Sequence, residues 1–194
     1  MMNEVIQCLL TRRSIRSYTD KPITEEELHT LLQCGLYAPN GGNNQVVRLT
    51  AITNRKVLDE LDKIAGQEFL KMVPLEGQYM NKAIYKARKN PTGYNFTFHA
   101  PVLIIASAPK GWPNGMADSA CALDNMLLAA TALGLGACWV NQLHWLTDNR
   151  PMRDYLRAYG ILDTEEIYGS MIAGHAAIPT PRPAPRKEGR IAVF

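Results

Sequence analysis

The segment RRSIR at residues 12–16 and the loop APNGGNNQ at residues 38–45 are the two most informative stretches of the chain. The first places three arginines and a serine directly after an amphipathic helical pattern. Alternate side chains of an extended backbone point to the same side, so Arg12, Ser14 and Arg16 should share a face that suits a phosphate. The amides and glycines of the second stretch suit the edge of a flat heterocycle. Together they suggest bound flavin mononucleotide (FMN).

Each stretch also has a plainer interpretation. Cations at the end of a helix are favoured by the helix dipole. The pair Gly41-Gly42 is a common turn signal. A solvated helix end and an ordinary turn therefore stay open for either stretch taken alone.

The composition is that of an ordinary globular protein. The 194 residues are 46% apolar and 20% charged, which predicts a single domain over residues 1–194. A net charge of +3 does not require a nucleic acid, and none is expected as a partner. Polar residues interrupt the longest apolar run, and no signal-peptide pattern is visible, so we expect a cytoplasmic protein without a membrane span. The four cysteines form no C-x-x-C pair, which argues against a disulfide framework or a metal site.

Capping signals and hydrophobic periodicity predict helices and strands in an uneven order. Asn3 should cap a first helix, and Thr24 with Glu27 forms a capping box for a second. A short third helix should run from Asn54 to Gly66. The second helix should bury one stripe, made of Leu28, Leu31, Leu32 and Leu36. Further strands are expected at 46–53, 102–106, 136–140 and 168–173, with helices over 118–133 and about 152–159. This mixed order predicts an α+β fold.

Two segments are less regular. Residues 67–98 mix helical pieces with prolines and glycines, and we expect them to form an excursion over the site rather than core. Residues 178–194 are rich in proline, so this tail should be extended.

Arg16 has a further expected role. Two-electron reduction of a flavin leaves negative charge at its pyrimidine edge, and a guanidinium there stabilises that charge. Such a charge-assisted hydrogen bond is worth about 1.5–3 kcal/mol, or about 30–65 mV for a two-electron couple. We expect Arg16 to raise the potential of bound FMN in this way.

Taken in order along the chain, the motifs resemble those of the nitroreductase family. The matching pieces are the two opening stretches, FHAPVLII at 98–105, and the run from Asp118 through Asn125 to GLGACW at 134–139. Each piece alone is common, whereas the ordered set covers nearly the whole chain. The resemblance implies an α+β fold with a mixed, mainly antiparallel sheet flanked by helices. It also implies an intertwined homodimer with two FMN sites at the interface.

The resemblance assigns residues to the cofactor. It implies that the phosphate end is held by Arg12, Arg13 and Ser14, and that the flavin pyrimidine faces Arg16. The loop that touches the ring, in this family usually from the other subunit, matches Pro39, Asn40, Gly41 and Asn43. The ribityl chain or ring edge is expected to contact Gln45. Atoms N5 and O4 should face the backbone of Val140 and Asn141, and further phosphate contacts should come from Arg186 and Lys187.

The activity that the resemblance implies is electron transfer from NADH or NADPH, through FMN, to a small organic acceptor such as a nitro compound or a quinone. The family mechanism is ping-pong, and the flavin carries the chemistry, so no catalytic side chain and no metal are expected. Val46-Val47 replaces the family's common Pro-aromatic pair, and Gln142 and His144 replace small residues, so the acceptor side departs from the pattern. Two alternatives stay open: a flavin-binding or regulatory module without turnover, and a specialised flavin dehydrogenase or dehalogenase.

Overall fold

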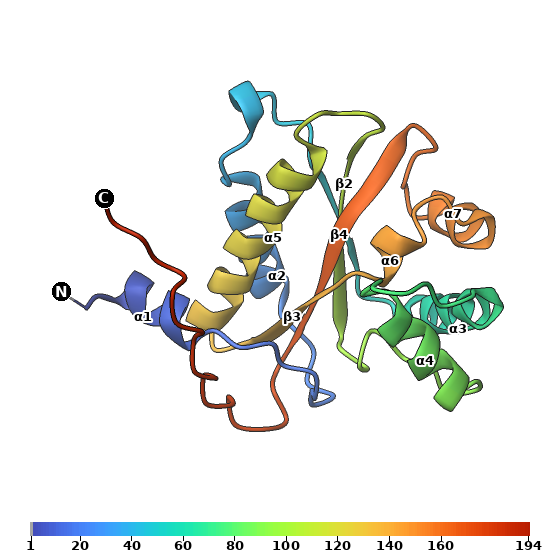
Figure 1. The fold of residues 1–194 in the computed structure, drawn as a ribbon, viewed down its shortest axis with the longest axis horizontal. Coiled ribbons are helices and arrows are strands. Elements are labelled where there is room, and N and C mark those ends of the chain that lie inside the picture. The colour runs from blue at the N-terminus through green and yellow to red at the C-terminus, as the bar shows by residue number, and fades with distance from the viewer. Residues whose placement is uncertain (1) are drawn as a thin grey trace.

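An antiparallel sheet forms the centre of the computed structural model, which describes residues 2–194 (Figure 1). Within these residues its four strands are β1 (Arg48–Ile52), β2 (Val102–Pro109), β3 (Gly136–Val140) and β4 (Glu165–Gly174), in the spatial order β1-β2-β4-β3. Ser14 adds a parallel bridge to Ala137 of β3, so the sheet is mixed where residues 12–16, the arginine segment, join it. The predicted α+β fold with a mainly antiparallel sheet is confirmed. Met1, where the predicted domain begins, lies outside the described residues.

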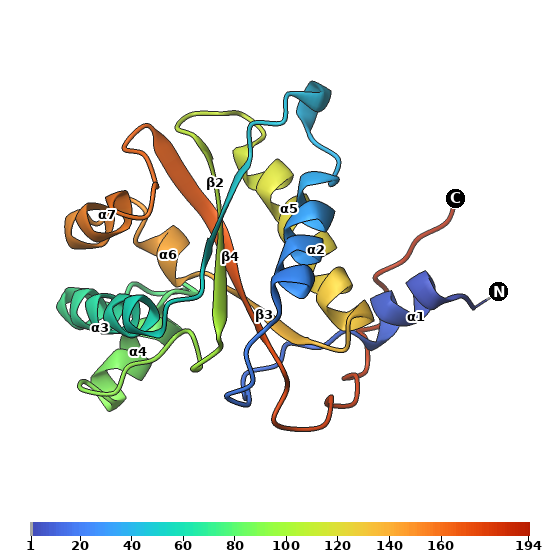
Figure 2. The ribbon, with the colours of Figure 1, turned by 180° about the vertical axis from the view of Figure 1, so that it is seen from behind.

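Helices cover both faces of the sheet (Figures 1 and 2). In the described part of the chain they are α1 (Glu4–Thr11), α2 (Glu25–Leu36), the 3-10 helix η1 (Gly41–Asn43), α3 (Arg55–Lys71), α4 (Asn81–Lys89), α5 (Gly115–Ala132), α6 (Gln142–Trp145) and α7 (Arg150–Arg157). Helices α2 and α5 pack on one face, and α3, α4, α6 and α7 lie on the other. Across residues 2–194 no helix is both long enough and apolar enough to cross a membrane.

Strand β2 separates two hydrophobic cores. Ile104 faces α2 and α5, where it is buried with Leu31 and Met126. Ile105, on the opposite side of the strand, is buried with Phe69 of α3. The two-residue period of a strand thus explains how one short apolar run supplies both cores.

Capping side chains begin several helices where the sequence predicts them. The Asn3 side chain accepts a hydrogen bond from the Ile6 N–H at 2.9 Å. Thr24 and Glu27 form the expected capping box at the start of α2. Asn54 accepts from the Lys56 N–H at 3.0 Å at the start of α3. These starts are local and therefore readable from the sequence.

The predicted end of the third helix is wrong. Helix α3 continues through Gly66 to Lys71. A Cβ at position 66 would lie 2.7 Å from the Cβ of Tyr94, which packs directly on the helix there. Gly66 therefore serves close packing instead of ending the helix.

The expectation that residues 67–98 lie over the site rather than in the core is also wrong in part. Phe69, Ile84 and Phe96 are fully buried, and Tyr94 nearly so. The hydrophobic side of α4 and the turn after it complete the core on the α3 face of the sheet. The opposite side of α4 does line a cavity, described below.

Apolar surface remains exposed on α1 and α2. Of the stripe predicted to be buried in α2, Leu31 is fully buried, whereas Leu36 is 55% exposed. On α1, Val5 and Leu9 are 66% and 51% exposed. Both helices border an apolar groove of about 390 Å³ along α5. Exposed apolar surface of this kind is typical of an interaction surface.

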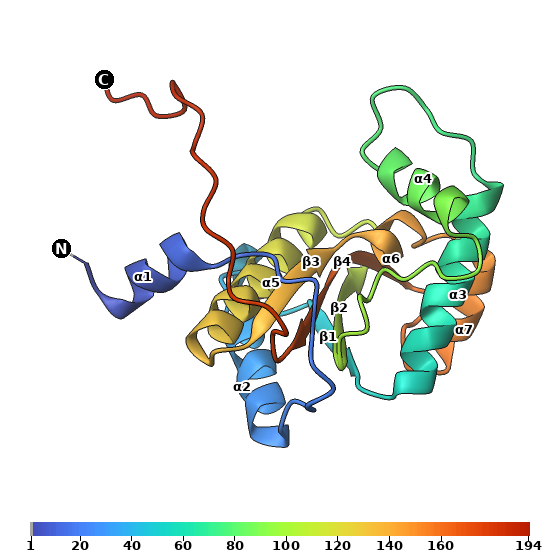
Figure 3. The same cartoon turned by 90° about the horizontal axis from the view of Figure 1, so that it is seen from below.

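The C-terminal tail is extended and exposed, as its proline content predicts. Residues 177–194 are exposed throughout and form no helix or strand. Both ends of the described chain lie on the same side of the molecule, near α1 (Figures 1 and 3).

Candidate functional site

The arginine segment is held as extended backbone beside β3. The Ile15 N–H donates to the carbonyl of Ala137 at 2.9 Å, and the Tyr18 hydroxyl donates to the carbonyl of Ile15 at 2.5 Å. Ile15 is buried against Gly136, where a Cβ would come within 2.8 Å of the isoleucine Cγ2. The close approach of the two backbones therefore depends on glycine at position 136.

Three side chains of this segment influence the pKa of the Cys138 thiol in β3. Burial raises the pKa of Cys138, and Arg16, Ser14 and Arg12 oppose that rise. Ser14 and Arg16 therefore lie close to this thiol, whereas Arg12 also borders a separate small cavity together with Arg13. Extended backbone directs alternate positions to a common side, which accounts for the nearness of Ser14 and Arg16.

Arg13 is directed elsewhere. Its guanidinium donates to the carbonyl of Leu10 at 3.0 Å and also to the carbonyl of Arg12. Both carbonyls belong to the C-terminal end of α1, where a cation is favoured by the helix dipole. For Arg13, the interpretation as a cation at a helix end is therefore the better one. The buried Nε of the same side chain has no hydrogen-bond partner within residues 2–194.

A cavity of about 420 Å³ opens beside Arg16, and we refer to it as the basic cavity. Val140 and Asn141, at the end of β3, form one side, and Lys82 and Lys86 of α4 form another. Aromatic rings complete the lining, namely Tyr79, Phe98, Trp139 and Trp145. Among the described residues three cations and no carboxylate line this cavity. It therefore favours a planar ligand with negative charge.

The cations of the basic cavity lie over aromatic rings. The Lys86 ammonium is 4.2 Å from the centroid of Phe98, and the Arg16 guanidinium carbon is 5.9 Å from the same centroid. The Lys82 ammonium is 4.4 Å from the centroid of Tyr79. Such contacts hold cations near an apolar surface and leave them able to meet an anion.

The backbone beneath Phe98 is strained. Phe98 and His99 have φ values of 53° and 56°, in the left-handed region that costs a residue with a side chain about 1–3 kcal/mol. The preceding residue, Thr97, is fixed because its N–H and hydroxyl both donate to buried Asp62, at 3.0 and 2.6 Å. This anchoring keeps the Phe98 ring beneath Lys86. Burial also lowers the pKa of Lys86; Asp62 opposes this effect and Arg16 adds to it.

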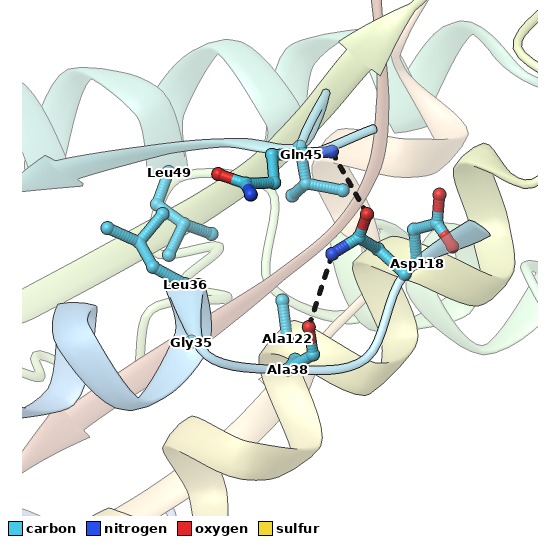
Figure 4. A pocket seen from close by; sticks show the side chains of 9 residues that line it. Gly35, Leu36, Ala38, Gln45, Leu49, Asp118 and Ala122 are labelled. Carbon is cyan, nitrogen blue, oxygen red and sulfur yellow. Dashed lines mark hydrogen bonds between the residues drawn. The ribbon is translucent and has the colours of Figure 1, made fainter. Parts of the chain in front are cut away.

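Residues 38–45, the amide loop, have a defined structure of their own (Figure 4). Asn40 accepts from the Gln45 N–H at 2.9 Å and donates to the carbonyl of Ala38 at 3.4 Å. Asn43 and Gln45 have left-handed φ values of 55° and 52°. Asn40 and Gln45 border a small cavity of about 140 Å³, while Pro39, Asn43 and Gln45 are exposed.

One chain does not bring the amide loop to the arginine segment. The loop is tied to the first turn of α5, where the Gly41 N–H donates to Asp118 at 2.9 Å. The arginine segment lies beside the start of β3, which follows the other end of α5. An 18-residue helix is about 27 Å long, and Figure 1 shows the loop and the segment at its opposite ends. The two predicted halves of the site are therefore separated within one chain.

Arg186 and Lys187 lie in the exposed tail, and within residues 2–194 they make no hydrogen bond or ion pair with the arginine segment. The tail does pass near it, because Thr180 borders a cavity of about 90 Å³ together with Arg12 and Arg13.

Sequence reasoning missed Lys82 and Lys86. Their spacing of four residues on a predicted helical piece was a signal that both share one side of a helix. The sequence carried no sign that this side faces Arg16, because that depends on how α4 docks on α3.

Comparison with known proteins supplies an independent finding. The model of the nitroreductase family matches residues 9–175, which include the arginine segment, the amide loop and the basic cavity. Among solved structures, the fold is similar to a nitroreductase with bound FMN from Bacteroides fragilis NCTC 9343. The TM-score is 0.89 and the identity is 31%, over 100% of both chains.

Two curated relatives match this chain over only part of their own length. The chain is 30% identical over 144 residues to the NADPH-flavin oxidoreductase of Vibrio harveyi, covering 73% of this chain and 55% of that protein. It is 29% identical over 139 residues to an FMN reductase (NAD(P)H) of Bacillus subtilis (strain 168), covering 70% of this chain and 53% of that protein. The match thus spans about half the length of these two relatives.

Proposed function

This chain belongs to the nitroreductase family, and on that premise we propose that it is an FMN-dependent oxidoreductase. It takes electrons from NADH or NADPH and passes them to a small organic acceptor of the nitro-compound or quinone type. The observation that carries the proposal is the basic cavity beside Arg16, where cations and flat aromatic rings meet. The similar B. fragilis structure contains FMN, and the V. harveyi relative is an NADPH-flavin oxidoreductase, which supports both cofactors.

The donor set of the chain fits FMN. Arg12 and Ser14 offer a bidentate cation and a hydroxyl for a phosphate. Arg16 supplies a cation for the pyrimidine edge. The Oε1 atom of Gln142 is buried at the cavity wall without a hydrogen-bond partner in the described residues, and a flavin ring edge carries an N–H of the kind it lacks.

When bound, FMN supplies the two-electron chemistry that the side chains do not. The chain positions the ring and sets its electrostatics. With FMN bound, the backbone of Val140 and Asn141 would border the redox-active edge, and Arg16 would supply positive charge at the pyrimidine. Arg13 hydrogen-bonds the end of α1 and would add only nearby positive charge at the phosphate end, and Arg186 and Lys187 would approach that end from the exposed tail.

We propose that a second copy of the chain completes the site. The separation of the arginine segment from the amide loop means that one chain alone leaves the ring without the loop. In the homodimer, the loop of one copy, with Pro39, Asn40, Gly41, Asn43 and Gln45, meets the arginine segment of the other. The exposed apolar faces of α1 and α2 offer surface for this association.

We propose that donor and acceptor would use the same side of the site in turn. At about 420 Å³, the basic cavity lies near the lower end of the range for small-molecule sites. If bound FMN leaves room for one further ring at a time, donor and acceptor would react in turn, which is a ping-pong mechanism.

Steady-state rates test the proposal. We expect NADPH or NADH oxidation with menadione or nitrofurazone, measured over a matrix of concentrations, to give parallel double-reciprocal lines. A flavin-containing protein that oxidises neither nicotinamide with either acceptor would favour a flavin-binding module without turnover. Turnover confined to a dedicated substrate would favour a specialised dehydrogenase or dehalogenase.

A further inference from the structure

We propose that Lys82 makes the basic cavity selective for anionic acceptors, in particular aromatic carboxylates that carry a nitro group. The inference rests on the proposed function, because it names the substrate class of the same site. Four observations support it: the uncompensated charge of the cavity, the engagement of the other two cations, the position of Lys82, and the rings beside it.

The basic cavity contains no internal counter-charge. Arg16, Lys82 and Lys86 take part in none of the ion pairs within residues 2–194. The carboxylate that acts on Lys86 is Asp62, and both of its oxygens accept hydrogen bonds from residues 96–97. Asp62 is not part of the cavity lining, so an anionic ligand would meet positive charge that no carboxylate of the lining neutralises.

Two of the three cations already have a role. The Lys86 ammonium donates to the carbonyl of Asn95. Arg16 faces the flavin pyrimidine in the proposed function. The Lys82 ammonium lies over the Tyr79 ring and makes no hydrogen bond in the described part of the chain. Lys82 is therefore the cation that remains able to pair with a second ligand.

Two aromatic rings, those of Tyr79 and Trp145, line the cavity together with Lys82. The centroids of Tyr79 and Trp145 are 6.0 Å apart, with an angle of 59° between the ring planes. An aromatic acceptor placed in the cavity contacts these rings while its carboxylate reaches Lys82. An uncharged acceptor of the same shape gains the ring contacts without the ion pair. The cavity should therefore bind the anionic acceptor more tightly than the uncharged one.

The chemistry requires no group beyond the proposed reactants. For a nitroarene carboxylate, one NAD(P)H and one proton convert the nitro group into a nitroso group and water. One N–O bond breaks, the donor leaves as NAD(P)⁺, and the carboxylate is unchanged. Lys82 is therefore a specificity residue that pairs with the substrate at a distance from the reacting atoms.

A matched series of acceptors tests this selectivity. 4-Nitrobenzoate, its methyl ester and 4-nitrobenzyltrimethylammonium carry charges of −1, 0 and +1 on similar nitroarenes. With the FMN-loaded protein, kcat/KM should fall in that order. Lys82→Gln should reduce the ratio of kcat/KM for benzoate over ester about fivefold, the size expected for one solvent-accessible ion pair.

Two variants serve as controls. Lys89→Gln makes the same charge change on α4 at an exposed position that does not line the cavity, and should leave the ratio unchanged. Lys82→Arg should keep the preference for the anion. The KM for NADPH is measured in parallel, because the nicotinamide donor is also an anion. If Lys82→Gln changes that KM and not the acceptor ratio, Lys82 serves the donor and the proposal is overturned.

Calorimetric binding separates this proposal from the proposed function. Titration of 4-nitrobenzoate and its methyl ester into the protein without NAD(P)H should show tighter binding of the anion, and Lys82→Gln should remove the difference. Equal or absent binding of the two compounds overturns the selectivity even when NAD(P)H oxidation is observed. Preferential binding of the anion without any NAD(P)H oxidation would instead contradict the proposed function and leave the selectivity standing.

Discussion

The carboxylate of Asp118 accepts a hydrogen bond from the backbone N–H of Gly41, with a distance of 2.9 Å at Oδ1. Its second oxygen accepts from the indole N–H of Trp112 at 3.0 Å. Asp118 belongs to the first turn of α5 and is only 5% exposed. These two hydrogen bonds therefore fix the amide loop and Trp112 to a core helix.

Replacing Asp118 by alanine should lower the free energy of unfolding by about 1–3 kcal/mol, because two N–H groups lose their acceptor. Urea denaturation measures this change, and hydrogen exchange at residues 40–45 should become faster. Asp124→Ala, at an exposed position of the same helix, is the control and should change stability by less than about 0.5 kcal/mol. Equal stabilities of the two variants would show that Asp118 does not anchor the loop.

The double variant Arg12→Ala/Ser14→Ala should lose FMN during purification, because the phosphate loses its cation and its hydroxyl donor. The FMN content per chain is measured from released flavin. Arg150→Ala, whose side chain is 92% exposed and lies on α7, should retain the wild-type content. Wild-type FMN content in the double variant would remove the phosphate assignment.

Mixed dimers extend this prediction to the second copy. Gly41→Val should disturb the amide loop, since the Asn114 side chain lies where a Cβ would stand. A dimer of one Gly41→Val chain and one Arg12→Ala/Ser14→Ala chain keeps one intact arginine segment facing one intact loop. It should bind one FMN, whereas a site made within each chain would bind none.

Arg16→Ala should lower the two-electron potential of bound FMN by about 30–65 mV, the equivalent of one charge-assisted hydrogen bond. Equilibration with reference dyes under anaerobic conditions measures the potential. Arg16→Lys keeps the charge and should fall between the wild type and the alanine variant. An unchanged potential in Arg16→Ala, with FMN still bound, would exclude the electrostatic role.

The pH dependence of stability should carry a contribution from Asp62. Burial raises the pKa of Asp62 above its ordinary value of 3.8, although hydrogen bonds from Thr97 and Phe96 oppose the rise. Folding therefore favours the protonated carboxyl, so this contribution is present below pH 3.8 and is lost as the pH rises through the pKa of the folded state. Asp62→Asn keeps a side-chain oxygen for the two backbone N–H groups and has no charge. Relative to this variant, the wild type should lose stability as the pH rises from about 4. Free energies of unfolding that change in parallel with pH in the wild type and in Asp62→Asn would contradict this contribution of Asp62.

Several features of the fold could be predicted because they depend on neighbouring residues alone. The Glu27 N–H donates to the Thr24 hydroxyl at 3.1 Å, and both groups lie within one turn of chain. The apolar run of β2 needed no knowledge of its partners to be recognised as a buried strand. In the site, the alternation of extended backbone was enough to place Ser14 and Arg16 on one side.

Features that depend on tertiary contacts could not be predicted. Gly66 resembles a helix end until Tyr94 is known to pack on it. The apolar residues Ala83, Ile84 and Ala87 show which side of α4 is buried, but periodicity could not tell which of its lysines face Arg16. Leu36 fits the apolar stripe of α2, but no other described part of the chain packs over it, and its sequence neighbours give no sign of this.

An anaerobic titration of the purified protein with NADPH, and separately with NADH, tests the central claim most directly. Bound flavin absorbs at about 450 nm. This band should bleach completely at about one reduced nicotinamide per FMN with at least one of the two donors. The colour should return when an acceptor such as menadione is added. A protein that binds no flavin, or a flavin band that neither nicotinamide bleaches, would contradict the assignment as an FMN-dependent NAD(P)H oxidoreductase.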